Sequence, residues 1–198
     1  MKNIKEVKRT LIVVDMVNGF IKEGNMKDRT IEKIIPENER LINEFIKEEE
    51  GLIFIKDCHE DNSIEFKKFP KHCVKGTSEA NLVDELLKYE QNALVYEKNS
   101  TSAIFAPHFI DDISKMENLS EVVITGCCTD ICVSNLAIPL QNYFDENNKE
   151  VNIIVPENAV ETYDSPYHPR DIYNDMAFKL MNQAGIKLVK KYEKRRGN

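Results

Sequence analysis

Six short apolar runs, rich in β-branched residues, constrain the fold of this chain more than any other feature of its sequence. They cover residues 10–15, 51–57, 92–98, 121–126, 151–157 and 186–192. Hydrophobic residues are nearly continuous within each run, which is typical of strands that are covered on both faces of a parallel sheet. The sequence therefore predicts six strands in a mainly parallel arrangement.

Helical patterns separate these strands. The stretch 29–50 brings Ile31, Leu41 and Phe45 onto one stripe, and further helical patterns cover residues 79–89, 132–144 and 170–185. Strands that alternate with helices are joined by right-handed crossovers. We therefore expect a doubly wound, three-layer α/β/α fold in which residues 1–198 form a single domain, since no repeat or linker interrupts the chain.

Composition narrows the class of protein. A hydrophobic content of 41% beside 31% charged residues is typical of a globular protein. The net charge of -7 argues against a nucleic-acid partner, and no apolar run approaches the roughly 20 residues that span a bilayer. Because Asp15 interrupts the first apolar run, we interpret it as a strand rather than a signal peptide. We expect a cytoplasmic protein whose five cysteines are reduced.

Reactive side chains follow the predicted strands at their carboxyl ends. Asp15 ends the first strand, Asp57 the second and Lys98 the third, and the fourth runs into the cysteine-rich segment "TGCCTDICV" at residues 125–133. In a parallel α/β sheet, ligands bind outside the carboxyl ends of the strands. The sequence therefore predicts that two acids, a lysine and a thiol meet at one edge of the sheet.

The cysteines of this segment have several readings. A structural zinc site lacks a second cysteine pair at a suitable distance, and a cytoplasmic disulfide is disfavoured. We interpret Cys127 and Cys128 as buried packing. Cys132 differs, because a helix starting near residue 130 would place it in the first turn, where the helix dipole stabilises a thiolate. Asp15 could then take the thiol proton, and Lys98 could hold the charge.

Three motifs carry a resemblance over nearly the whole chain. "VVDMVNGF", "VYEKNSTSAIFAP" and "ITGCCTDICVSNLA" resemble, in this order, the motifs of the isochorismatase-like cysteine hydrolases, whose domain is Rossmann-like. The resemblance implies that Asp15, Lys98 and Cys132 form the catalytic triad. It also implies a cis peptide bond between Cys127 and Cys128, and an oxyanion hole made by the backbone N–H groups of Cys128 and Cys132.

The long segment 57–77 holds a candidate metal site made of Asp57, His59, Glu65 and His72. On spacing alone, a solvated acidic loop is the favoured reading, and the resemblance described next reverses that preference. Nitrogen and carboxylate ligands suit one divalent ion, with zinc first and iron(II) or manganese(II) as alternatives. The sequence "FPKHCVKGT" resembles the metal loop of nicotinamidases within this family, which implies that these four residues are ligands, Glu65 less directly.

The same resemblance implies a substrate. Phe20 and Phe69 match positions where nicotinamidases hold the pyridine ring, although either could be a core residue. The implied reaction hydrolyses nicotinamide to nicotinate and ammonia through a cysteine thioester, in NAD salvage. The chain departs from many relatives in lacking an Arg-Tyr pair after Lys98, where it reads "NSTSAIFA".

Two other functions stay open at this stage. One is hydrolysis of a different amide or a carbamoyl compound by the same triad, and the other is a metal-binding or redox-sensing module. The expected partner is a small molecule rather than nucleic acid or membrane, and assembly into a homo-oligomer is left open.

Overall fold

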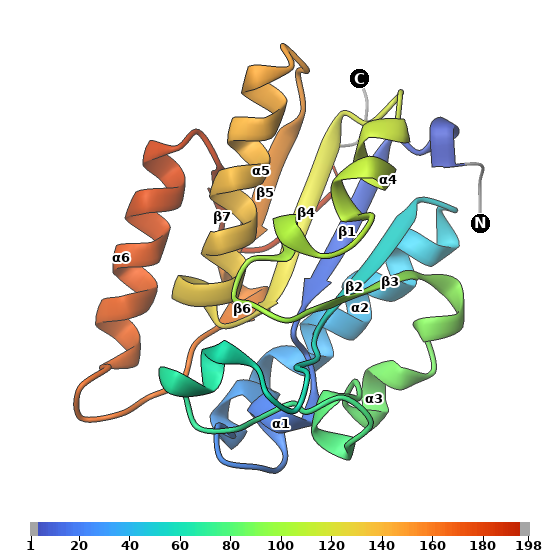
Figure 1. Ribbon diagram of the computed structural model, residues 1–198. Coiled ribbons are helices and arrows are strands. Elements are labelled where there is room, and N and C mark those ends of the chain that lie inside the picture. The colour runs from blue at the N-terminus through green and yellow to red at the C-terminus, as the bar shows by residue number, and fades with distance from the viewer. Residues whose placement is uncertain (1–3, 195–198) are drawn as a thin grey trace.

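A computed structural model describes residues 4–194 and contains one parallel sheet at its centre (Figure 1). The strands are β1 (Arg9–Val14), β2 (Gly51–Asp57), β3 (Leu94–Lys98), β4 (Glu121–Cys127), β5 (Asn152–Pro156), β6 (Val160–Glu161) and β7 (Lys187–Val189). Their order is β3-β2-β1-β4-β5-β7, with β6 paired to β4, and every pairing is parallel. The predicted doubly wound sheet is confirmed, and the seventh strand is the two-residue β6.

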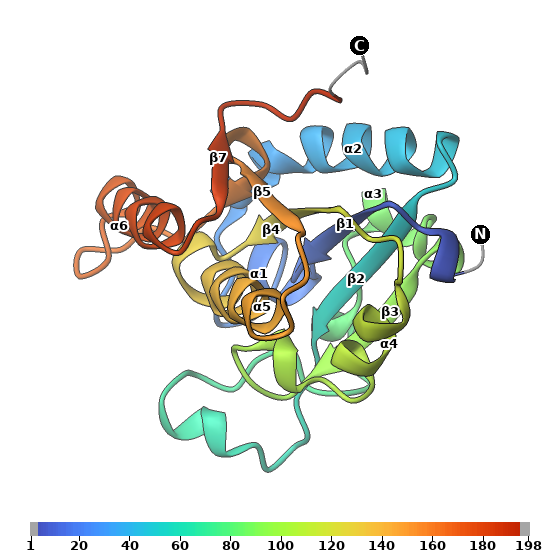
Figure 2. The same ribbon diagram turned by 90° about the horizontal axis from the view of Figure 1, so that it is seen from above.

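Helices cover both faces of the sheet (Figure 2). They are α1 (Asn18–Ile21), α2 (Ile35–Lys47), α3 (Asp84–Leu87), α4 (Phe109–Lys115), α5 (Ser134–Glu146) and α6 (Arg170–Gln183). Buried side chains of α4, α5 and α6 share one apolar cluster, and those of α1, α2 and α3 share a second on the opposite face. Within residues 4–194, no helix has both the length and the apolar character needed to cross a bilayer.

The alternation of side chains along β1 explains why its sequence is continuously apolar. Ile12 and Val14 belong to the first cluster, whereas Leu11 and Val13 belong to the second. All four side chains are fully buried. Since successive residues of a strand point to opposite faces, a sheet covered on both sides needs apolar residues at every position.

Two predicted helices are shorter in the structure. The pattern over 29–50 divides into a 3-10 turn at Arg29–Ile34 and helix α2, because Pro36 occupies the first helical turn, where its missing N–H costs nothing. The pattern over 79–89 yields only the four-residue α3, preceded by a short turn at Ser78–Ala80.

The strand order changes direction between β1 and β4, and this is where a doubly wound sheet opens a crevice. The two strands approach closely at Gly126, where a β-carbon would lie 2.0 Å from the carbonyl oxygen of Val14. Glycine is therefore required at this position. Asp15 leaves β1 with a φ of 51°, in the left-handed region, and Cys127 ends β4 beside it.

Candidate active site

Cys132 lies in a π-helical turn, Thr129–Val133, that joins β4 to α5. The sequence-based expectation of an ordinary first helical turn is therefore corrected. The backbone N–H groups of Ile131 and Val133 both donate to the carbonyl oxygen of Cys128, each at 3.1 Å. The peptide bond between Cys127 and Cys128 is cis, as the resemblance implied. The result is a tight turn that carries Cys128 and Cys132 on the wall of one pocket.

The predicted triad comes together around Lys98. Its Nζ lies 2.8 Å from Asp15 Oδ2 and 3.6 Å from Cys132 Sγ. The same ammonium also lies 2.7 Å from Asp57 Oδ1, a contact that the sequence did not predict. All four residues are buried. Lys98 therefore joins the thiol group to the candidate metal ligands.

Burial and the lysine set the charges of this site. Burial raises the pKa of Asp15 to about 6, although Lys98 opposes the shift. Burial also raises the pKa of the Cys132 thiol well above its usual value, again against the effect of Lys98. Burial alone would lower the pKa of Lys98, but Asp15 and Asp57 raise it well above its usual value. The site thus favours a protonated thiol beside a base, rather than the preformed thiolate expected at a helix start.

Three of the predicted metal ligands point their donor atoms at one place. Asp57 Oδ2 lies 2.9 Å from His59 Nε2 and 3.1 Å from His72 Nε2, and the two ring nitrogens are 3.2 Å apart. Ligands bound about 2.0–2.1 Å from one first-row ion lie roughly 3.0–3.4 Å from each other. The spacing of the three atoms therefore fits a single divalent ion.

The hydrogen bonds behind the rings support the same conclusion. His72 Nδ1 donates to the carbonyl oxygen of Pro70 at 2.7 Å. His59 Nδ1 donates to Asn99 Oδ1 at 3.0 Å, and this oxygen also accepts the N–H of Glu60. With Nδ1 as the donor, a neutral form of either ring would present its Nε2 lone pair toward the Asp57 carboxylate. Converging lone pairs suit a cation.

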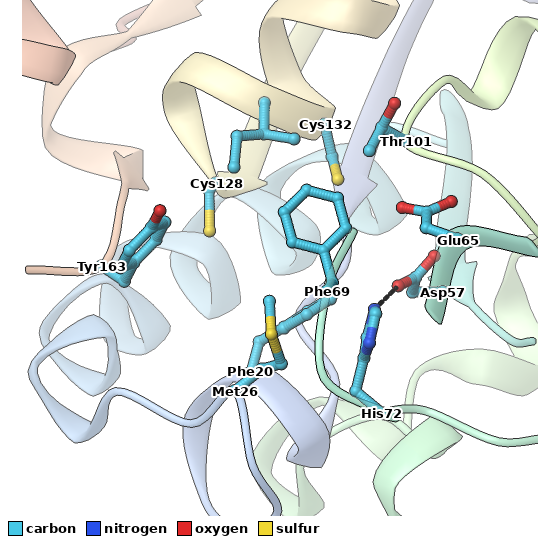
Figure 3. Close-up of a pocket in the computed structure, with 11 residues that line it drawn as sticks. Phe20, Met26, Asp57, Glu65, Phe69, His72, Thr101, Cys128, Cys132 and Tyr163 are labelled. Carbon is cyan, nitrogen blue, oxygen red and sulfur yellow. Dashed lines mark hydrogen bonds and ion pairs between the residues drawn. The ribbon is translucent and has the colours of Figure 1, made fainter. Parts of the chain in front are cut away.

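Glu65 stands apart from this group. Among the described residues, only Asp57, His59 and His72 form a cluster with all ligand atoms within 4.8 Å of one another. Glu65 instead lines the pocket beside Asp57 (Figure 3). From this position Glu65 could reach a metal ion from the pocket side. Its role as a metal ligand stays a prediction.

A pocket lies between the Cys132 thiol and His72 (Figure 3). Its lining residues are Phe20, Met26, Asp57, Glu65, Phe69, His72, Thr101, Cys128, Ile131, Cys132 and Tyr163. Phe20 and Phe69 are thus both at the pocket, and their rings lie 5.5 and 6.3 Å from that of His72.

Sequence reasoning missed four lining residues, Met26, Thr101, Ile131 and Tyr163. Ile131 and Thr101 could have been found by their places next to Cys132 and in the segment after Lys98. Met26 and Tyr163 come from loops that carry no motif. Cys128, interpreted as packing, also has its side chain at the pocket wall.

Comparisons with known proteins agree with this arrangement. The isochorismatase domain model matches residues 9–190. Nicotinamidase 1 of Arabidopsis thaliana is 30% identical over 200 residues, which cover 91% of this chain and 81% of that protein. The crystal structure of nicotinamidase PncA from Bacillus subtilis has a TM-score of 0.74 and 26% identity, covering 93% of this chain and 100% of that one.

A pyrazinamidase of Pyrococcus horikoshii in complex with zinc has the same fold, with a TM-score of 0.74 at 24% identity over 92% of this chain and 98% of that one. The family match extends over almost the whole length of the sheet and its helices, in agreement with the triad motifs and the fold. This chain belongs to the isochorismatase family.

Proposed function

We propose that this protein is a nicotinamidase, which hydrolyses nicotinamide to nicotinate and ammonia. One observation carries the proposal: a cysteine, two phenylalanines and two members of the Asp/His/His group, Asp57 and His72, line a single small pocket. A flat heteroaromatic amide offers a carbonyl carbon to a thiol, a ring nitrogen to a cation and two faces to aromatic side chains. The nicotinamidase relative at 30% identity supports the same substrate.

In the proposed reaction, Asp15 takes the proton of the Cys132 thiol as the sulfur attacks the carboxamide carbon. The oxyanion accepts hydrogen bonds from the backbone N–H groups of Cys128 and Cys132. Asp15 then gives its proton to the departing ammonia, and a thioester remains. Water attacks the thioester with Asp15 as the base, which releases nicotinate and restores the thiol. Lys98 holds Asp15 and favours the charged forms of its neighbours.

The candidate metal ligands and the aromatic residues would hold the ring of the substrate. A divalent ion held by Asp57, His59 and His72, with Glu65 as a further ligand, would supply a Lewis-acid contact for the pyridine nitrogen. Zinc suits this donor set best, and iron(II) or manganese(II) would also fit it. Phe20 and Phe69 would pack against the ring, so that the carboxamide faces Cys132.

Ammonia release from nicotinamide and from benzamide tests this proposal, together with elemental analysis of the purified protein. Benzamide keeps the carboxamide but lacks the ring nitrogen, so we expect a much poorer substrate; a lost contact of this kind costs about 1–3 kcal/mol or more. The Lys98→Met variant should be inactive on both. Equal rates for the two amides, or a metal-free active protein, would contradict the proposal.

The two alternative functions, a carbamoyl hydrolase and a redox-sensing module, lead to different expected results in the same assay. A carbamoyl hydrolase would prefer N-carbamoyl compounds in a substrate panel, and the relatives do not favour it. A redox-sensing module would not need Lys98 for its response. We further propose a cytoplasmic location, since all five cysteines are free thiols.

A further inference from the structure

A second, partly buried cluster lies beside the Cys132 turn and has no part in the proposed reaction. Its centre is His168, whose side chain is buried in the loop before α6. His168 Nε2 lies 2.8 Å from Asp130 Oδ2, and Asp130 Oδ1 accepts a hydrogen bond from the Thr162 hydroxyl at 2.6 Å. Asp130 belongs to the same π-helical turn as Cys132. The cluster therefore ties that turn to the loop that follows β6.

Both ring nitrogens of His168 face acceptors. Nε2 faces the Asp130 carboxylate, and Nδ1 lies 3.1 Å from the backbone carbonyl oxygen of Tyr163. A neutral imidazole has one N–H and can make only one of these two bonds. A ring that donates from both nitrogens satisfies both acceptors, and its bond to the part-buried Asp130 carboxylate is a charge-assisted one.

The faces of the same ring are also occupied. The His168 ring stacks on Tyr163 at 3.9 Å with an interplanar angle of 10°, and on Tyr173 of α6 at 3.6 Å and 25°. Tyr163 in turn lines the pocket, on the same side as Cys128 (Figure 3). The edge of the His168 ring thus contacts the turn that bears Cys132, and a face of the same ring contacts a wall of the pocket.

We propose that His168 is a positioning residue that fixes the Cys132 turn through Asp130 and orients Tyr163 as a wall of the pocket. The inference rests on the proposed function for its kinetic test only. Loss of the edge contact should act on the chemical step, because small displacements of a nucleophile are costly. Loss of the face contact should act on the binding of the substrate ring.

Separate variants distinguish the two contacts. Asp130→Asn keeps an acceptor for Thr162 but loses the charged bond, so kcat for nicotinamide should fall about tenfold with little change in KM. Tyr163→Leu should raise KM with little change in kcat, and Tyr163→Phe, which keeps the stacked ring, should restore KM. His168→Asn should show both effects. The double variant His168→Asn/Asp130→Asn should lose little more kcat than His168→Asn, since both changes break one bond.

His108→Asn is the matched control, because His108 is exposed and lies outside both the cluster and the pocket; its kinetics should match the wild type. A substrate-independent measurement separates this inference from the proposed function: the rate at which iodoacetamide alkylates Cys132, mapped by mass spectrometry. That rate should fall severalfold in Asp130→Asn and His168→Asn, as the sulfur loses its contact with Lys98. Wild-type alkylation rates in both variants, or fully additive losses of kcat, would overturn the role of His168.

Discussion

Asp15 has an ionisation that falls within the working range of an enzyme. Burial raises the pKa of its carboxyl to about 6, and Lys98 works against that shift. Only the ionised form can accept the thiol proton, so kcat/KM on nicotinamide should fall as the pH drops through about 6. A bound cation would move this limb to lower pH, because positive charge favours the carboxylate.

The pH–rate profile of a Lys98→Arg variant checks that Asp15 is the group that titrates. Arginine is used because the Lys98→Met variant is expected to be inactive and would give no profile. The arginine keeps a positive charge in a wider side chain, so a residual activity should show the limb displaced to higher pH. An unmoved limb would mean that a different group titrates. The raised pKa of Asp15 also affects the free energy of unfolding. Protonated Asp15 contributes to stability in full below the ordinary pKa of 3.8, and this contribution is lost as the pH rises through about 6.

Alanine substitutions at the three cysteines that follow or end β4 should have different effects on activity. Cys132→Ala should abolish turnover, because it removes the nucleophile. Cys127 is fully buried and donates to the backbone oxygen of Asp15, while Cys128 contributes a backbone N–H that alanine retains. Cys127→Ala and Cys128→Ala should therefore keep most of the activity in an ammonia-release assay. Full activity in Cys132→Ala would exclude the covalent mechanism.

Residue identities at the strand ends were predictable, but several of their contacts were not. The parallel-sheet rule alone was enough to group Asp15, Asp57 and Lys98. It could not show that Lys98 touches both acids, because that depends on which oxygen each carboxylate turns inward. Nor could it find Tyr163 or His168, whose roles come from loops brought together only by the fold.

At the scale of elements, the end of β3 serves both parts of the site. Lys98 contacts the other two members of the triad, Asp15 and Cys132, and the next residue, Asn99, accepts a hydrogen bond from Nδ1 of His59, which leaves Nε2 to face a cation. Asn99→Leu should therefore lower metal affinity about 10- to 100-fold, as loss of a partner behind a ligand commonly does. Competition with a chelator of known affinity measures this directly.

Asn182→Leu provides a control for that substitution, because Asn182 is exposed near the end of α6. Its metal affinity should equal that of the wild type. If Asn99→Leu binds the metal as tightly as the control does, the hydrogen bond to His59 has no part in the site.

The periodicity of apolar residues was a good predictor of which side chains are buried, but a poor predictor of helix length. Leu82 and Leu86 are buried as the pattern over 79–89 indicates, yet only α3 is helical there, since the backbone N–H of Val83 donates to the carbonyl of Met16. The π-helical turn around Cys132 and the two-residue β6 have no sequence pattern of their own. Both depend on contacts between distant segments.

At the scale of the whole molecule, metal binding should stabilise the fold. A ligand that binds only the native state adds about 2.7 kcal/mol to the free energy of unfolding at 100 times its dissociation constant. Urea unfolding of the metal-free protein with and without excess zinc should show a gain of that order. In His72→Ala the gain should be much smaller, and an equal gain would place the zinc elsewhere.

The layer architecture was predictable because one physical rule covers the whole chain. Continuous apolar strands need helices on both faces, and β1 has them through α2 on one side and α5 on the other. The order of the strands was not predictable in the same way. Which strands become neighbours depends on packing among all the helices, and the reversal between β1 and β4 that locates the pocket is one outcome of that packing.

The two oxygens of Asp57 give the molecule a property that neither centre has alone. Oδ1 contacts Lys98 of the triad, while Oδ2 faces the two histidines. Coupling between two sites is reciprocal in free energy. Whatever factor a bound cation applies to an equilibrium at Cys132, an acyl group on Cys132 must apply to the affinity for the cation. If a cation binds there as proposed, its affinity should change with each stage of turnover, and a single dissociation constant would describe only the resting protein.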